Sequence, residues 1–447
     1  MMAFEKEALA ALTERLKAAE FHDVRYYVQT TRQMRINVLD GENEKTSRSN
    51  ESAYFVEAGK NGKRCCTFFN TLDMMDDVVA QMEFSAFSAE EEYHPIPAFE
   101  QDEVYADSFE MTGEPEVVRG LVEMEKVMKQ EPKTRNVETC SCAQAAREIT
   151  LMDENGRTKS DMSHSVTVSA KVVSAENGDV EIAWDERGGN RFEDVDCNAL
   201  GAEVAQQGAA ALHGAPILSG KYAVILKNSA AAELLEAYLP IFYASEMQNN
   251  MSALAGKNGE QIAVEDLNVI EDPKLEGGRS GRHFDDEGSA VSRKFLIHEG
   301  KFETALYNRD SAQKDHTVST GNGFKGDVTS AVYTGVTNVS VESASGSVMS
   351  RDELFRRMEN GIMVTSLEGV FAGANTVSGT FSLLCKGVVI RNGAPAEPFC
   401  KVTIAGSIYD LLREIVAMGD DPTATADGSK YLRAPSLLLK GLAVSGL

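Results

Sequence analysis

The sequence has few basic residues for its acidic content: 44 Lys and Arg stand against 69 Asp and Glu among 447 residues, a formal net charge of −25. Proteins that bind nucleic acid draw much of their affinity from Lys and Arg contacts to phosphates, and anionic membrane surfaces attract the same side chains. Contiguous basic residues occur only in pairs such as Lys63-Arg64 and Arg293-Lys294. We therefore expect neither nucleic acid nor a membrane among the partners.

The sequence also lacks a long apolar segment. Its most apolar helical stretch, residues 234–244, is interrupted by Glu236 and Pro240 and is far shorter than the roughly 20 residues that span a bilayer. The first 20 residues mix charged with apolar side chains and contain no signal-peptide core. Seven cysteines, an odd number, are typical of reduced thiols rather than a disulfide framework. These features predict a cytoplasmic protein.

The order of apolar and turn residues predicts an α+β fold with two domains. Residues 1–190 are expected to form N-terminal helices and an antiparallel sheet, and residues 191–447 a strand-rich C-terminal domain with a few helices. The acidic segment 85–110, with Pro95 and Pro97, is expected to be an exposed connection.

Leu9, Leu12 and Leu16 share one face of an expected first helix. Asn155-Gly156 and Asn177-Gly178 have the chemistry of hairpin turns. We expect further helices at residues 74–82, 116–129, 198–213, 230–238 (with Ser229 as N-cap), 351–360 and 408–418, and strands at residues 24–29, 33–39, 53–58, 64–69, 147–152, 165–173, 180–184 and 222–226.

Metal-binding motifs are incomplete. His298-Glu299 begins like the HExxH of a zinc-protease helix, but Phe302 stands where the second histidine is needed, and Gly300 favours a hairpin turn. The pairs Cys65-Cys66 and Cys140/Cys142 lack the spacing of a zinc knuckle, so buried thiols on strands are the better interpretation.

The segment from Gly321 to Gly326 has the letters GxGxxG. A dinucleotide site requires a strand before this motif and a helix after it, whereas residues 328–341 have the composition of strands. A turn that needs positive φ is therefore the favoured interpretation.

Residues 277–288 combine glycines with His283 and three carboxylates, Asp285, Asp286 and Glu287. Such a cluster could perform acid–base chemistry or hold a divalent cation. Alternatively, the acids accept hydrogen bonds from backbone amides and from Arg279 or Arg282 within an irregular crossing. Spacing alone favours the second interpretation.

A series of short motifs runs through the second half of the chain in a consistent order. Residues 295–300, 359–364, 378–382, 392–393 and 435–446 belong to it. Together with the signature residues below, they resemble the TldD/PmbA family, historically labelled modulators of DNA gyrase. The resemblance covers most of residues 200–447 and continues more weakly toward the N-terminus. The signature residues, whose role the resemblance leaves open, are Phe284, Asp285, Asp286, Glu287, Gly288, Thr320, Gly321 and Asn322.

The resemblance implies metal-dependent proteolysis in the cytoplasm. Catalytic members of the family look like zinc peptidases, with an HExxxH helix that follows a strand and a third ligand, a Cys, near the C-terminus. Here the helix expected after residues 222–226 reads through residues 233–241 without a histidine, and no cysteine follows Cys400. We therefore carry over no catalytic, cofactor-binding or metal-binding residue. The chain resembles the PmbA (TldE) branch, the zinc-less subunit that pairs with a TldD-like chain in which zinc is expected.

Three functions follow from these observations, in decreasing order of support. The first is the zinc-less subunit of a heterodimeric metalloprotease that processes or degrades unfolded peptides and small proteins, inactive on its own. The second is a stand-alone homodimeric peptide-binding or chaperone-like module. The third is a hydrolase that uses Asp285, Asp286, Glu287 and His283 with some other metal.

Overall fold

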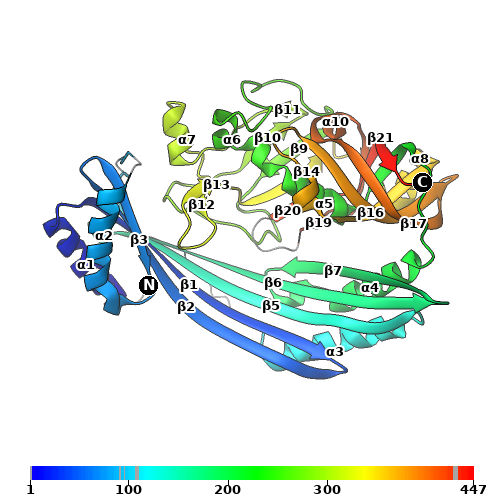
Figure 1. Ribbon diagram of the computed structural model, residues 1–447, viewed down its shortest axis with the longest axis horizontal. Coiled ribbons are helices and arrows are strands. Elements are labelled where there is room, and N and C mark those ends of the chain that lie inside the picture. The colour runs from blue at the N-terminus through cyan, green and yellow to red at the C-terminus, as the bar shows by residue number, and fades with distance from the viewer. Residues whose placement is uncertain (1–2, 90–91, 95, 106–109, 426–430) are drawn as a thin grey trace.

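The computed structural model confirms the α+β fold class. A sheet of long strands from the first half of the chain lies against a strand-rich second half (Figure 1). No helix in the described part of the chain combines the length and apolar character needed to cross a bilayer. Pro95 of the expected connection lies outside the described residues, which are 3–89, 92–94, 96–105, 110–425 and 431–447.

The first sheet is antiparallel except for its short edge strand β4, in the order β3-β2-β1-β5-β6-β4, and β7 also pairs with β6. The separate strands predicted at residues 24–29 and 33–39 are one continuous strand of 18 residues. The polar residues between them keep the pairing, since Thr31 lies opposite Glu51 on one side and Arg147 on the other. The strands are β1 (His22–Leu39), β2 (Glu42–Lys60), β3 (Lys63–Phe69), β4 (Glu103–Val104), β5 (Thr134–Met152), β6 (Thr158–Glu176) and β7 (Asp179–Gly189).

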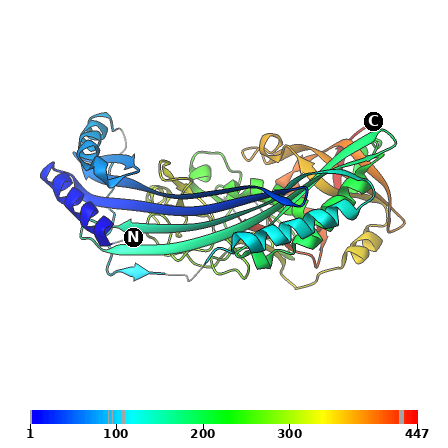
Figure 2. The same ribbon diagram turned by 90° about the horizontal axis from the view of Figure 1, so that it is seen from below.

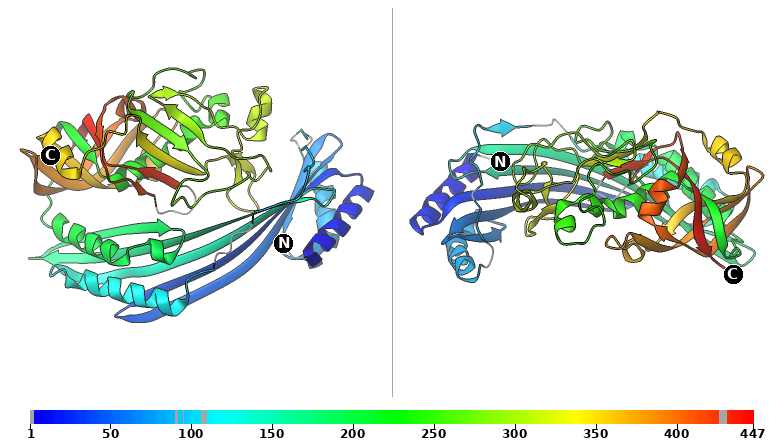
Figure 3. Two further views of the ribbon diagram at one scale, coloured as in Figure 1. Left: turned by 180° about the vertical axis from the view of Figure 1, so that it is seen from behind. Right: turned by 90° about the horizontal axis from the view of Figure 1, so that it is seen from above.

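Helices cover one face of this sheet, which we call the helical face. Helix α1 (Ala3–Ala18) buries the three leucines predicted to share a face, and α2 (Met75–Ser88) packs beside it. Helices α3 (Glu114–Gln130) and α4 (Cys197–Ala211) cover the other end of the same face (Figures 2 and 3). Helix α4 follows residue 190 in the chain, yet it packs on this N-terminal sheet. The predicted division into domains between residues 190 and 191 stays a prediction. Two short 3₁₀ helices are η1 (Leu72–Met74) and η2 (Phe192–Asp194).

The opposite face carries the odd-numbered positions of β1 and β5, and we call it the cavity face. Near one end it is apolar, where Tyr27, Ile149 and Leu151 pack against Phe284 and Val328 of the second half. Farther along the strands this face is polar. Because successive side chains of a strand point to opposite faces of the sheet, these polar residues lie on the face away from the helices.

The second half contains two six-stranded sheets and a separate hairpin. Its core joins residues of both sheets with the buried side of helix α5. One of these two sheets has the order β17-β16-β15-β8-β21-β18, and the other has the order β11-β10-β9-β14-β20-β19. The strands are β8 (Gly220–Leu226), β9 (Leu267–Glu271), β10 (Lys294–His298), β11 (Lys301–Phe302), β12 (Gly323–Lys325), β13 (Val332–Thr334), β14 (Asn338–Ser343), β15 (Gly361–Glu368), β16 (Thr380–Arg391), β17 (Ala394–Ser407), β18 (Ile415–Met418), β19 (Thr423–Ala424), β20 (Tyr431–Ala434) and β21 (Leu437–Ser445).

Two helix predictions in this half are corrected. The N-cap of α5 is Lys227 rather than Ser229, because the helix begins at once after β8. The helix predicted at residues 408–418 ends at Arg413, since residues 415–418 pair with β21 as β18. The helices are α5 (Asn228–Ala237), η3 (Leu239–Phe242), α6 (Ala244–Gln248), α7 (Arg309–Lys314), α8 (Arg351–Met358), α9 (Val370–Gly373) and α10 (Ile408–Arg413).

The predicted hairpin turns are confirmed. Asn177 and Gly178 have φ of +51° and +87° between β6 and β7. Glu299 and Gly300 have φ of +49° and +76° between β10 and β11, so His298-Glu299 belongs to a turn and not to a zinc-protease helix.

Candidate functional site

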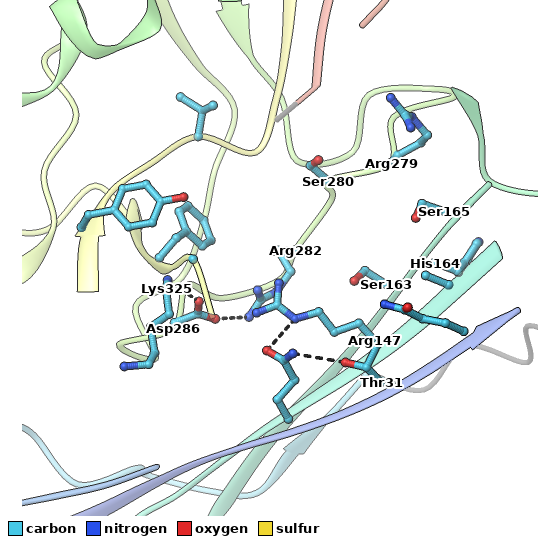
Figure 4. Close-up of a pocket in the computed structure, with 17 residues that line it drawn as sticks. Thr31, Arg147, Ser163, His164, Ser165, Arg279, Ser280, Arg282, Asp286 and Lys325 are labelled. Carbon is cyan, nitrogen blue, oxygen red and sulfur yellow. Dashed lines mark hydrogen bonds and ion pairs between the residues drawn. The ribbon is translucent and has the colours of Figure 1, made fainter. Parts of the chain in front are cut away.

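A cavity of about 380 Å³ lies between the cavity face of the first sheet and loops of the second half (Figure 4). Three adjacent strands form its floor. Thr31 of β1 lies opposite Arg147 of β5, which in turn lies opposite Ser163 of β6. The floor residues are Gln29, Thr31, Gln33, Ala145, Arg147, Ser163, His164 and Ser165, and the remaining lining residues are Arg279, Ser280, Arg282, Asp286, Phe324, Lys325, Gly326, Tyr333 and Val336.

The lining is cationic in a strongly acidic chain. Arg147, Arg279, Arg282 and Lys325 reach the cavity, and Asp286 is the single carboxylate among its described lining residues. Even when Asp161 behind Arg282 is included, cations outnumber carboxylates two to one. The charge of the cavity lining is therefore positive, whereas the net charge of the whole chain is negative.

Arg282 is held between two carboxylates. Its Nη2 lies 2.9 Å from Asp286 Oδ1, and its Nε lies 3.5 Å from Asp161 Oδ2. Its side chain is only 8% exposed. The guanidinium is thus oriented by the protein itself.

Arg147 is held by neutral groups instead. Its Nε donates to Gln29 Oε1 at 2.9 Å and its Nη2 to the Tyr27 hydroxyl at 2.7 Å. Gln29 in turn donates to Thr31 Oγ1 at 3.1 Å. These bonds orient the guanidinium without neutralising it.

Lys325 and Arg279 complete the cationic lining. The ammonium of Lys325 donates to the carbonyl of Ser330 and lies 3.7 Å from the centre of the Phe55 ring, and burial lowers its pKa. Arg279 donates to the carbonyl of Thr425 and lies against Gly188, where a Cβ would come within 2.3 Å of the guanidinium carbon.

The signature residue Asp285 is fully buried and accepts three backbone hydrogen bonds. The amides of Glu287 and Ser289 donate to Oδ1 at 3.0 and 2.8 Å, and the amide of Gly323 donates to Oδ2 at 2.9 Å. Asp285 therefore ties the Gly-rich crossing to the start of β12.

Asp286 joins the same two segments from the cavity side. Its Oδ2 accepts from the amide of Lys325 at 2.8 Å while its Oδ1 pairs with Arg282. Both features of the favoured interpretation, backbone amides and Arg282 as donors to these acids, are present in the structure.

Glu287 points the other way, toward α7. Its Oε2 accepts from the amide of Arg309 at 2.8 Å. Burial, and then the neighbouring charge of Asp285, raises the pKa of Glu287. Burial also raises the pKa of Asp285, but the hydrogen bonds that Asp285 accepts from three backbone amides stabilise its charged form and oppose this shift. Glu287 is therefore the acid that retains a proton.

The signature residues Thr320, Gly321 and Asn322 form a second buried network. The Asn322 amide donates to both oxygens of Glu271, at 2.9 and 3.1 Å, and its oxygen accepts from Thr320 Oγ1 at 2.7 Å. Lys294 Nζ lies 2.8 Å from Glu271. Gly321 has φ of +75°, as the turn interpretation predicts, and β12 and β13 follow it in place of a helix.

The remaining signature positions are packing residues in this geometry, whereas the side chain of His283 is half-exposed. Phe284 is buried, and Gly288 has φ of +83° with Phe99 against the place of a Cβ. His283 stacks on Tyr105 with ring centres 3.9 Å apart, and its Nδ1 lies 3.1 Å from Asp161 Oδ1.

No group of three or more His, Cys, Asp or Glu side chains within the described ranges has a geometry that could hold a metal ion. All seven cysteines are free, and burial raises the pKa of Cys142 to about 12 and also raises that of Cys400. A raised thiol pKa disfavours the thiolate that metals bind. Glu233 on α5 has a pKa raised to about 7 by burial, Glu236 and Asp185.

Sequence reasoning missed most of the cavity. It singled out Asp286, Arg279 and Arg282 but not the floor, whose clearest member is Arg147. The only local signal was a run of polar residues from Gln29 to Gln33 between the apolar residues Val28 and Met34, and such a run does not show which face of a strand is polar.

Comparison with known proteins was made for sequence and for structure. A family model described as the PmbA/TldA metallopeptidase C-terminal domain matches residues 219–446, just over half of the chain. The metalloprotease PmbA of Escherichia coli O157:H7 is 26% identical over 281 residues, which are 63% of this chain and 58% of that protein. A metalloprotease PmbA homolog of Buchnera aphidicola subsp. Baizongia pistaciae is 24% identical over 282 residues, 63% of this chain and 59% of that protein. The chain thus aligns with less than two thirds of the length of these relatives.

Two crystal structures share the fold over nearly the whole chain. One is a Thermotoga maritima protein described as a modulator of a DNA gyrase, with a TM-score of 0.86 and 24% identity over 99% of this chain and 100% of that chain. The other is TldE from Thermococcus kodakarensis, with a TM-score of 0.86 and 19% identity over 98% of this chain and 100% of that chain.

Proposed function

The chain belongs to the TldD/PmbA family, and from that membership we propose that it is the zinc-less subunit of a cytoplasmic metalloprotease that processes or degrades unfolded peptides and small proteins. Its partner is a TldD-like subunit that carries zinc. The observation that carries the proposal is the composition of α5, which follows strand β8 as the HExxxH helix follows a strand in the family's peptidases. Residues 228–241 contain no histidine.

The three carboxylates of the signature support the same conclusion, because their contacts are structural. Asp285, Asp286 and Glu287 each accept at least one backbone amide. An acid with its oxygens directed at backbone amides holds two chain segments together. The activity of the assembly is therefore assigned to the partner's metal.

The polar face and the edge of the first sheet support the binding of extended peptides. An extended peptide can pair with a strand edge through its main chain, which tolerates many side chains. Strand β7 pairs with β6 along one edge, and the cavity face beside it carries neutral hydroxyl and amide groups. These features favour peptides without a defined sequence.

The test is to purify the full chain alone and together with a TldD-like chain that carries HExxxH, and to measure zinc and cleavage of an unfolded peptide. We expect zinc and cleavage only in the mixture. A matched control replaces the histidines of the partner's motif, which should abolish cleavage without separating the subunits. Stoichiometric zinc and cleavage by the chain alone would overturn the proposal.

The stand-alone homodimeric peptide-binding module is kept as a second candidate because the cavity is complete within one chain. Light scattering on the full chain, with and without the TldD-like chain, separates the two functions. A homodimer that ignores the TldD-like chain supports the second candidate, and a heterodimer supports the first.

A further inference from the structure

We propose that the cavity between the first sheet and the β12–β13 hairpin binds a carboxylate of an extended peptide, with Arg147 as its principal ligand. The carboxylate belongs to an acidic side chain or to the peptide's C-terminus. This inference rests on the proposed function and adds to it a preference for one chemical group.

The distribution of charge is the first argument. In a chain of net charge −25, random placement would surround a cavity with acids, yet this lining holds four cations and one carboxylate among its described residues. Gathering like charges is unfavourable unless an anion offsets the repulsion. The arrangement is typical of a site that binds an oxyanion.

The position of Arg147 is the second argument. It projects from the middle strand of the floor, and in Figure 4 it and Arg282 extend from opposite walls toward the same region. Arg147 Nη2 lies 2.7 Å from the Tyr27 hydroxyl, and Arg147, Arg282 and Asp286 all line the same cavity. Gln29 and Tyr27, which accept hydrogen bonds from Arg147, are neutral, so its positive charge is available to a ligand.

Preorganisation is the third argument. Asp286 and Asp161 hold Arg282, and the amide of Lys325 holds Asp286. Gln29 and Tyr27 hold Arg147 before any ligand arrives. Side chains that are already ordered lose little conformational entropy on binding, and a planar guanidinium matches a carboxylate through two parallel hydrogen bonds.

The neutral part of the lining selects a peptide as the source of the carboxylate. Thr31 of β1 and Ser163 and Ser165 of β6 place hydroxyls along two of the three floor strands, and Phe324 and Tyr333 offer apolar surface on the other side. The volume of about 380 Å³ lies in the range of about 300–1,000 Å³ typical of ligand sites. A carboxylate on an extended chain can use the arginines, the hydroxyls and the apolar surface together, whereas a free phosphate leaves the apolar surface unused.

The experiment measures binding of fluorescently labelled, unstructured peptides to the full chain by polarisation. The peptides differ only in one central residue, Glu or Gln, and each is made with a free and with an amidated C-terminus. We expect at least one carboxylate-bearing peptide to bind about tenfold more tightly than its neutral counterpart, a factor equivalent to about 1.4 kcal/mol. The arm that shows the preference identifies the side chain or the C-terminus as the source.

Arg147→Gln should remove this preference, and Arg147→Lys, which keeps the charge but loses the planar guanidinium, should retain part of it. The matched control is Arg35→Gln, because Arg35 is exposed on the same face of β1 two residues beyond Gln33. The control should keep the full preference. Should Arg147→Gln fail to fold, the affinities of the wild-type chain for the carboxylate-bearing and neutral peptides still decide whether the cavity prefers a carboxylate.

Equal binding of all four peptides by the wild-type chain would overturn the inference, as would a preference that Arg147→Gln leaves intact. Displacement of equally bound peptides by inorganic phosphate would reassign the cavity to phosphate and overturn it too. The proposed function is judged separately, by cleavage in the mixture with the TldD-like chain. Cleavage without any carboxylate preference would therefore remove the inference alone.

Discussion

At the scale of single residues, Asp285 shows how a carboxylate can resemble a catalytic group and serve as a structural one. It is fully buried, and its two oxygens are occupied by three backbone amides from two segments. A general acid or a metal ligand must reach a substrate or an ion, and these contacts face the chain instead.

Replacing Asp285 with alanine should therefore unfold the chain more easily. Three amides, one of them in a buried hydrogen bond and two in partly buried ones, would lose their acceptor, and an unsatisfied buried group costs about 1–3 kcal/mol, so we expect a loss of about 3 kcal/mol in the free energy of unfolding. Denaturant titration measures it. Glu276→Ala is the control, an exposed acid of the same crossing, and should change stability by less than about 0.5 kcal/mol. A stable Asp285→Ala chain that has lost function would contradict the structural role.

Glu287 should give the chain a pH-dependent stability. Burial and Asp285 raise its folded pKa from the usual 4.5 to about 8. Between these pH values the folded state keeps a proton that the unfolded chain releases, so stability falls as the pH rises through this range. Glu287→Gln keeps an oxygen for the Arg309 amide and should remove that loss.

Melting temperatures of the wild type and of Glu287→Gln, recorded across the same pH range, test this. The two should be similar at the acidic end and diverge toward pH 8, where the variant is the more stable. Glu276→Gln, at an exposed site, should follow the wild type throughout. Parallel curves for wild type and Glu287→Gln would show that Glu287 ionises normally.

Sequence could locate these acids but could not decide their role. Residues 284–288 stood out by composition, and the sequence allowed either a catalytic or metal-binding role or a structural role for their acids. The decision depends on the amide of Gly323, which lies in a different segment and meets Asp285 only in the folded chain, and on the pairing of Arg282 with Asp286 within the crossing. Arg147 carried no local signal, because a single arginine on a strand is ordinary.

At the scale of elements, the polar face of the long strands explains where prediction failed. Helix α1 and the Asn-Gly turns were predicted because their patterns are local. The strand β1 was predicted in two pieces, since Thr30, Thr31 and Arg32 interrupt the apolar alternation. Those polar residues continue the ladder, and Thr31 supplies part of the cavity floor. One of the residues that obscured the strand thus belongs to the cavity.

The turn before β12 should tolerate only glycine at position 321. Gly321 has φ of +75°, and a Cβ there would come within 2.3 Å of the carbonyl oxygen of Ala290. Gly346 has nearly the same φ, +74°, but open space around it. Gly346→Ala should therefore lose only the backbone cost, about 1–2 kcal/mol, and Gly321→Ala clearly more, because backbone must move.

Thermal unfolding of both variants separates the two contributions. The difference between them reports the packing of the turn against Ala290, since the backbone cost is common to both. Equal losses in the two variants would show that the β12–β13 hairpin adjusts freely. The hairpin would then be unable to hold Lys325 and Asp286 in place.

At the scale of the whole molecule, the cavity exists only because two halves of the chain meet. Its floor comes from residues 29–33 and 145–165 and its other walls from residues 279–286 and 324–336. Lys386 and Glu181, 2.9 Å apart, form a further contact between the halves. The fold class and family could be recognised from composition and motif order. The cavity could not, because its parts are separated by more than a hundred residues and no periodicity links them.

The charge of the molecule and the charge of its cavity have opposite signs, and binding kinetics should reveal both. An acidic peptide first meets the field of a chain with net charge −25, which repels it over about 30 Å at 0.01 M salt but over only about 8 Å at 0.15 M. Its association rate constant, measured by stopped-flow with the labelled Glu peptide, should therefore rise with salt, while that of a peptide with Lys at the same position should fall. Arg147→Gln should raise the dissociation rate and leave the salt dependence of association unchanged, because a contact inside the cavity acts after the encounter. Association of the Glu peptide that slows with added salt would show that the arginines dominate the field at long range, and that the acidic surface plays no part in admitting peptides.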